Sequence, residues 1–139
     1  MNYAGDLSPE HAWEKVAAGA LLVDVRTAPE WTHIGIPDTS AVGAEPAFVQ
    51  WNLAGGAANP QFLEQLRNAV AEAKTGDGVE LVFLCRSGAR SVAAAEAATA
   101  AGFTAFNVLE GFEGAADAYG DRVINGWKNR HLPWKRAGA

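Results

Sequence analysis

The chain has 139 residues, enough for one domain with its own hydrophobic core and too few for two ordinary domains. Hydrophobic residues make up 49% of it and charged residues 19%, which excludes a disordered chain, and no apolar run reaches the roughly 20 residues of a membrane helix. The formal net charge of −5 is unevenly spread, because the tail from Arg122 onward has five basic residues and no acidic one. We expect this basic tail to dock on the acidic remainder of its own domain, and we expect no nucleic-acid or membrane partner.

Cysteine and histidine usage limits the chemistry further. Cys85 is the only cysteine, so the chain cannot form an internal disulfide. The three histidines are far apart in the sequence and give no metal-ligand spacing. The N-terminus has neither the basic start nor the apolar stretch of a secretory signal, so a cytoplasmic location is expected. We predict neither a metal nor any other cofactor.

Helices and strands are predicted to alternate along the chain, each delimited by caps, prolines or glycines. In chain order we predict a helix between 8 and 19, strands at 21–25 and 47–51, a helix between 59 and 76, a strand at 79–84, a helix at 90–101 and a strand at 104–109. The remainder of 26–58 is rich in proline and glycine and is predicted as mainly loop with short ordered pieces. This alternation predicts a single α/β domain with a mostly parallel sheet.

Cys85 lies where a predicted strand ends and a helix begins, the place where functional groups of parallel sheets gather. A thiol is nucleophilic as the thiolate, and the unpaired N–H groups and partial positive charge of a helix N-terminus favour an anion there. Gly88 allows the backbone to curl so that successive N–H groups point inward, and Arg86 and Arg90 add two cations. The loop is therefore predicted to be an anion cradle with a nucleophile at its floor.

The residues around Cys85 argue against the simplest interpretation of a lone cysteine. A single cysteine at the end of a buried strand is most often a small core residue without a chemical role. Two arginines and two serines follow this one, and these are poor neighbours for inert packing. We expect Arg86 to orient an anionic donor, and we expect Ser87 and Ser91 to be hydroxyl donors near the thiolate, with helix capping as the alternative for Ser91.

Arg90 has two interpretations. A cation in the first turn of a helix is unfavourable unless something offsets it. Arg90 therefore either binds substrate or pairs with a carboxylate, such as Asp24 or Glu30, to hold the loop, and we favour pairing. Asp24 itself is expected to be a hydrogen-bond acceptor at the strand end.

The segment Cys85-Arg86-Ser87-Gly88-Ala89-Arg90-Ser91 resembles the active-site loop of the rhodanese family, in which a cysteine starts a six-residue bend that leads into a helix. Two further segments resemble motifs of that family in the correct order, namely Leu22-Val23-Asp24-Val25-Arg26 with Glu30-Trp31, and Asn107-Val108-Leu109-Glu110-Gly111-Phe112. The resemblance covers about residues 8–120. One departure is His33-Ile34-Gly35-Ile36-Pro37-Asp38, where the family usually has Gly-His-Ile-Pro-Gly, so His33 receives no catalytic role.

The resemblance implies one rhodanese-like domain over residues 1–139, with three α/β/α layers around a sheet of about five strands. It implies a sulfurtransferase that moves a sulfane sulfur from a small anionic donor, such as thiosulfate, to cyanide, a cellular thiol or a protein acceptor through a persulfide on Cys85. The other loop residues would bind the substrate and the persulfide: Arg86, Ser87, Gly88, Ala89, Arg90 and Ser91. Asp24, Arg26 and Glu30 would support the site.

Two alternatives remain. The first is a non-catalytic module of this kind that senses sulfide or persulfide or binds a partner, although the retained Cys85 and two basic loop residues favour catalysis. The second is a cysteine phosphatase or arsenate reductase. Cysteine phosphatases have a Cys-x5-Arg pattern whose arginine clamps the oxyanion, whereas here Ser91 fills that position and Arg90 comes one residue earlier. The loop is thus one residue short for phosphate and suits a terminal sulfur.

Overall fold

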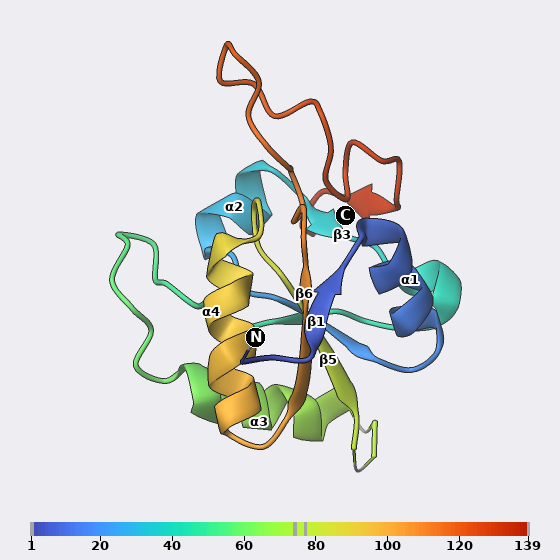
Figure 1. The fold of residues 1–139 in the computed structure, drawn as a ribbon, viewed down its shortest axis with the longest axis vertical. Helices are drawn as coiled ribbons and strands as arrows, with labels where there is room; N and C mark the ends of the chain where they lie inside the picture. Colours follow the sequence, from blue (N-terminus) through green and yellow to red (C-terminus); the bar gives the residue numbers. More distant parts are fainter. Residues whose placement is uncertain (1, 74, 77, 139) are drawn as a thin grey trace.

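Five parallel strands form the central sheet, in the order β1-β6-β5-β2-β4. They are β1 (Gly5–Leu7), β2 (Leu21–Asp24), β4 (Ala47–Phe48), β5 (Glu80–Leu84) and β6 (Thr104–Val108). The computed structural model describes residues 2–73, 75–76 and 78–138 (Figure 1). The two central partners, β5 and β2, are nearly continuous apolar runs, as expected for strands that are covered on both faces.

Helices cover both faces of this sheet. They are α1 (Pro9–Ala17), α2 (Ala28–His33), the 3-10 helix η1 (Ser40–Val42), α3 (Phe62–Ala73) and α4 (Ala89–Ala100). Alternate residues of the strands feed two separate cores, one under α3 and α4 and the other under α1 and the C-terminal segment (Figure 1). The structure thus confirms the predicted three-layer α/β/α domain. No helix among the described residues is long and apolar enough to cross a membrane.

The alanine-rich sequence of α4 lets this helix lie close to the sheet. Ala94, Ala95 and Ala98 are fully buried against the strands. Small side chains permit a short distance between a helix and a sheet, and α4 follows β5 after only a four-residue loop. The N-terminus of α4 is therefore fixed at the carboxyl end of β5.

The C-terminal tail docks on its own domain, as predicted from the charge distribution. Trp127 is fully buried, and its Nε1 donates a hydrogen bond to the carbonyl oxygen of Pro133. Farther along, β7 (Trp134–Lys135) pairs antiparallel with β3 (Ile36–Pro37) in a small second sheet. Arg130 binds the carboxylate of Glu110.

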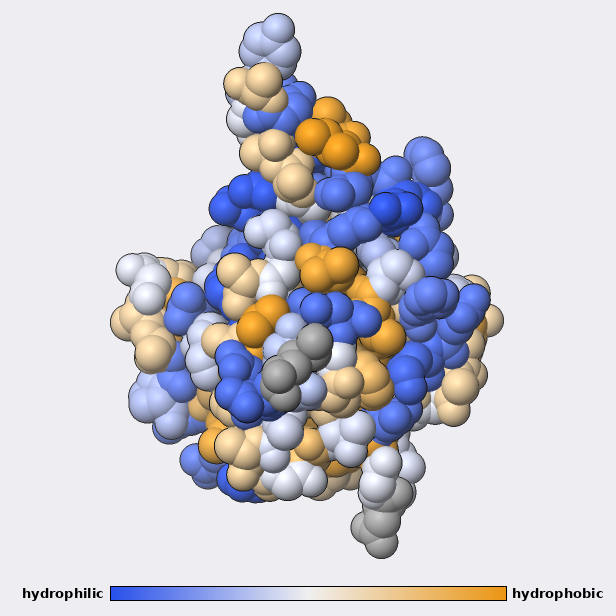
Figure 2. All heavy atoms as spheres, in the orientation of Figure 1, coloured by the Kyte–Doolittle hydropathy of each residue, from blue (hydrophilic) through white to orange (hydrophobic). Residues whose placement is uncertain are grey.

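Before this docked part, residues 115–126 project from the domain (Figure 1). Val123 and Ile124 expose apolar side chains there, and Figure 2 shows apolar surface on the projecting part.

The structure refines several of the predicted boundaries and adds short elements. The segment 26–58 contains the short helix α2, which begins after a capping box formed by Thr27 and Glu30, and the 3-10 helix η1. The strand predicted at 47–51 is limited to Ala47–Phe48, and the helix predicted from 59 begins at Phe62. The edge strand β1 was not predicted, because three residues are too few to show a periodic pattern.

Candidate functional site

Cys85 directly follows β5, and its side chain is 1% exposed. The backbone N–H of Gly88 donates a hydrogen bond to Cys85 Sγ at 3.1 Å, and Ser91 Oγ lies 3.2 Å from the same sulfur. The sulfur therefore sits at the start of α4, where backbone N–H groups and the helix dipole favour an anion. The structure places Cys85 at the predicted junction between a strand and the start of a helix.

Both the backbone conformation and the available space require a glycine at position 88. Its φ angle is 113°, in the region that residues with a side chain rarely adopt. A Cβ atom at this position would also lie 2.5 Å from the carbonyl oxygen of Leu109. A larger residue would therefore displace the N–H group that reaches the Cys85 sulfur.

A turn after β6 supports the loop from behind. The N–H of Phe112 donates to the carbonyl oxygen of Cys85 at 2.8 Å, and the N–H groups of Glu113 and Gly114 donate to that of Arg86 at 3.0 and 3.1 Å. Because a trans peptide directs its C=O and N–H to opposite sides, these bonds turn the N–H groups of residues 86 and 87 away from the turn. The sequence showed this glycine turn only as a family motif, without its role.

The loop leaves several backbone donors free. The N–H groups of residues 86, 87, 89 and 90 donate to no protein group within the described part of the chain. These four residues line, together with Cys85, a cavity of about 320 Å³. The cavity is lined by Glu30, Cys85, Arg86, Ser87, Ala89 and Arg90. Free donors around an open space make a binding site for a small anion.

Arg90 and Glu30 form a two-pronged ion pair at the edge of this cavity. Arg90 Nη1 lies 2.6 Å from Glu30 Oε1, and Nη2 lies 2.9 Å from Oε2. Burial alone would raise the pKa of Glu30, but hydrogen bonds from Arg90 and from the Thr27 backbone outweigh it and lower this pKa to about 2. The pair joins α2 to α4, so the geometry matches the loop-holding alternative for Arg90.

Replacing Glu30 with glutamine should remove a pH-dependent part of the stability. Because the pKa of Glu30 falls from 4.5 to about 2 on folding, its contribution is complete above pH 4.5 and is lost as the pH falls toward 2. We expect Glu30→Gln to lower the free energy of unfolding at pH 7 by about 1 kcal/mol, with the difference from wild type vanishing near pH 2.

Urea unfolding at several pH values measures this difference. Glu45→Gln, which changes an exposed glutamate, is the matched control and should show no such closing gap. A difference for Glu30→Gln that stays constant with pH would contradict the role given to the ion pair.

Arg86 contrasts with Arg90. Its side chain is exposed, and among the residues that the structure describes it makes no hydrogen bond or ion pair. It lines the cavity beside Cys85. Arg86 is therefore the cation available for an incoming anion.

Asp24 and Arg26 lie away from the cavity. Both side chains are fully buried, and Arg26 Nη2 lies 2.7 Å from Asp24 Oδ2 and 2.8 Å from the carbonyl oxygen of Gly35. The guanidinium group also stacks 4.2 Å from the centre of the Phe112 ring. Asp24 is thus a hydrogen-bond acceptor at the strand end, as predicted. The two residues hold segments together under the loop rather than lining the site.

Asn107 was not singled out by the sequence, but it belongs to the surroundings of the site. Its side chain is buried on β6, where Ser91 Oγ lies 2.5 Å from its Oδ1. Ser91 in turn touches Cys85, so Asn107 is one side chain removed from the sulfur. The sequence signal that could have singled it out is a polar residue within the late-strand motif.

Comparison with known proteins agrees with this geometry. The family model described as rhodanese-like domain matches residues 8–118. An uncharacterized protein of Rickettsia conorii is 35% identical over 119 residues, which cover 84% of this chain and 83% of that protein. The crystal structure of Rv0390 from M. tuberculosis is 46% identical, with a TM-score of 0.89 over 97% of this chain and 99% of that one.

Proposed function

This chain belongs to the family of rhodanese-like domains, and from that premise we propose that it is a sulfurtransferase that carries a sulfane sulfur as a persulfide on Cys85. One observation carries the proposal: Cys85 lines a small cavity together with Arg86 and with residues whose backbone N–H groups make no hydrogen bond within the described part of the chain. This arrangement suits a thiolate that receives an anionic sulfur compound. A free thiolate nucleophile fits the reducing cytoplasm.

The first half-reaction loads the cysteine. The Cys85 thiolate attacks the outer sulfur of a donor such as thiosulfate. A new S–S bond forms, the S–S bond of thiosulfate breaks, and its electron pair leaves with sulfite. The terminal sulfur of the persulfide then carries negative charge, which the N–H groups of residues 86, 87, 89 and 90 stabilise.

The second half-reaction empties the cysteine. A thiophilic acceptor, cyanide in the test tube or a cellular thiol, attacks the terminal sulfur and takes it, and the electron pair of the broken S–S bond returns to Cys85. Sulfite leaves before the acceptor arrives, so the kinetics are of the ping-pong type. Double-reciprocal plots of the rate of thiocyanate formation, measured at several concentrations of thiosulfate and cyanide, should give parallel lines. Intersecting lines would show that both substrates bind before sulfite leaves, which contradicts a persulfide form of the enzyme between two half-reactions.

Arg86 should act on the binding of the donor. We expect Arg86→Ala to raise the KM for thiosulfate about tenfold, because it loses one charge-assisted hydrogen bond to a dianion. Arg86→Lys should recover part of the loss, and Arg67→Ala removes the same charge from an exposed position on α3 as a control. Equal KM values for Arg86→Ala and Arg67→Ala would contradict this role.

A further inference from the structure

Ser91 lies between Cys85 and a competing acceptor. Its Oγ is 3.2 Å from Cys85 Sγ, 3.1 Å from the carbonyl oxygen of Gly88 and 2.5 Å from Asn107 Oδ1. A serine hydroxyl carries a single proton, so it can donate to only one of these three acceptors at a time. The shortest contact is the one with Asn107.

The orientation of the Asn107 side chain is fixed from its other end. Asn107 Nδ2 donates to Asp6 Oδ1 at 3.0 Å, and the hydroxyl of Tyr3 donates to the same oxygen at 2.7 Å. A carboxylate only accepts hydrogen bonds, so the amide group must face Asp6 with its NH2 and Ser91 with its oxygen. Asp6 thus determines that the amide oxygen of Asn107, and not its NH2 group, faces Ser91.

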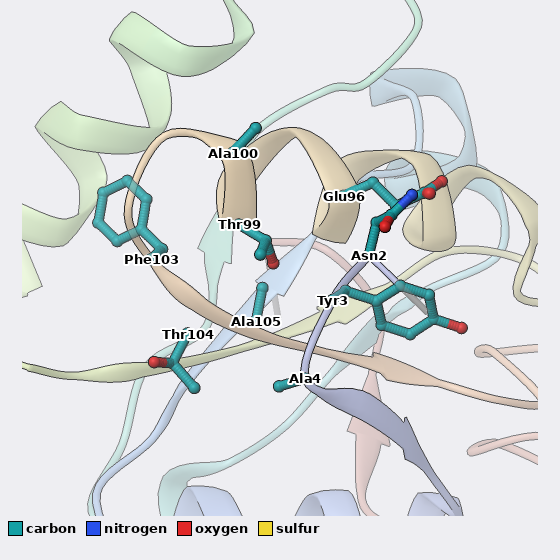
Figure 3. A pocket seen from close by; sticks show the side chains of 9 residues that line it. All are labelled: Asn2, Tyr3, Ala4, Glu96, Thr99, Ala100, Phe103, Thr104 and Ala105. Atoms are coloured by element: carbon teal, nitrogen blue, oxygen red, sulfur yellow. The ribbon is translucent and has the colours of Figure 1, made fainter.

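Tyr3 completes this chain of contacts at the sheet edge. It lines a second cavity of about 680 Å³ between the N-terminal segment and α4, and its phenolic oxygen points away from Thr99 and Phe103 (Figure 3). The hydrogen bond to Asp6 raises the pKa of Tyr3, with burial adding to the effect, so the phenol keeps its proton further into the alkaline range.

We propose that Asn107 is a positioning residue that holds the hydroxyl proton of Ser91 away from Cys85 Sγ. The serine then presents a lone pair to the sulfur. A neutral thiol can donate its S–H to that lone pair, whereas a thiolate cannot. The contact therefore opposes formation of the free thiolate, while the N–H of Gly88 and the helix N-terminus favour it.

The consequence for catalysis rests on the proposed sulfur transfer. When Cys85 becomes a persulfide, the negative charge moves to the terminal sulfur and Sγ becomes neutral, so the lone pair of Ser91 no longer faces an anion. If Cys85 starts as the neutral thiol, it releases its proton to solvent before it attacks the donor. Sulfite then leaves with the electron pair of the broken S–S bond. Asn107 thus destabilises the empty thiolate relative to the loaded persulfide.

Other charges also act on the ionisation of Cys85. Arg86 adjoins it in the loop, and Arg90 approaches from α4 in its pair with Glu30 of α2. From the strands, Asp24 lies within electrostatic reach of Arg90 but is paired.

Two further charged groups near Cys85 are Arg26 and Asp6. Arg26 neutralises Asp24, and Asp6 acts from β1 behind Asn107. A test must therefore separate the contact through Ser91 from a general change of charge or packing.

The test is the pH profile of Cys85, read as thiolate absorbance near 240 nm against Cys85→Ser and as the rate of alkylation by iodoacetamide. Because the chain has a single cysteine, both signals report this residue alone. We expect Asn107→Ala to move the midpoint to lower pH by about one unit, since Ser91 is then free to donate a charge-assisted hydrogen bond to the thiolate. Asn59→Ala, which truncates another buried asparagine remote from the loop, should leave the midpoint in place.

The Ser91→Ala background identifies the route of the effect. In that background, Asn107→Ala should no longer move the midpoint, and Ser91→Ala alone should not raise it. A shift that persists without Ser91 would overturn the proposal, as would an upward shift in Ser91→Ala, because the serine would then be a donor to the thiolate in the wild-type protein.

An exposed residue provides a second variant if Asn107→Ala does not fold. Asp6→Ala removes the acceptor that orients the Asn107 amide, so it should also lower the midpoint, and again only when Ser91 is present. An unchanged midpoint in Asp6→Ala, or a shift that survives in Ser91→Ala, would count against the proposal. These readouts need no sulfur donor, so they can fail while sulfur transfer holds, or hold while it fails.

Discussion

Replacing Cys85 with serine is expected to reduce thiosulfate-dependent thiocyanate formation about a thousandfold or more, to the uncatalysed rate. A serine hydroxyl keeps nearly the shape of the thiol, but it does not ionise at neutral pH and forms no persulfide. The initial rate at saturating thiosulfate and cyanide measures the effect.

Two controls separate the loss of the nucleophile from a general effect of substitution. Thr75→Ala removes an exposed hydroxyl group that does not line the cavity beside Cys85, and it should retain the activity of wild type. The melting temperature of Cys85→Ser should remain near that of wild type, because oxygen and sulfur fill similar space. Equal rates for Cys85→Ser and wild type would favour the non-catalytic alternative, in which the domain senses sulfide or binds a partner.

The second large effect is expected on stability, from the buried pair of Asp24 and Arg26. Removing the carboxylate in Asp24→Ala leaves a fully buried guanidinium group without its counter-charge. We expect the free energy of unfolding to fall by about 3–5 kcal/mol, the typical cost of breaking a buried ion pair from one side. Urea unfolding followed by circular dichroism at pH 7 measures this loss.

The double variant Asp24→Leu with Arg26→Met tests the cause of that loss. It removes both charges and fills the space with apolar side chains, so it should be more stable than Asp24→Ala. A single variant within about 1 kcal/mol of wild type, or a double variant less stable than the single one, would show that the pair does not anchor this part of the fold.

The sequence predicts the parts of the fold that are encoded locally. The helix caps and apolar runs identify the main helices and central strands, and the strand-to-helix junction identifies Cys85 as the candidate nucleophile. The shortest strands could not be predicted in this way. The edge strand β1 and the pairing of β3 with β7 involve two or three residues each, which are too few for a periodic pattern.

Contacts between side chains that are distant in the sequence could not be predicted either. The pattern allowed Arg90 to pair with Asp24 or Glu30, and only the folded chain brings Glu30, 60 residues away, to its guanidinium group. Asn107 is likewise 16 residues from Ser91 and reaches it because β6 lies beside β5 in the sheet. Such contacts depend on strand order, which local patterns do not specify.

Mass spectrometry of the protein and of its proteolytic peptides after incubation with thiosulfate tests the central claim most directly. The proposed mechanism predicts a mass increase of about 32 Da, one sulfur atom, on the peptide that contains Cys85, and its loss when cyanide is added. Cys85→Ser should gain no mass under the same conditions. A wild-type protein that turns over thiosulfate without ever carrying this sulfur on Cys85, or that carries it equally after the serine substitution, would contradict the account.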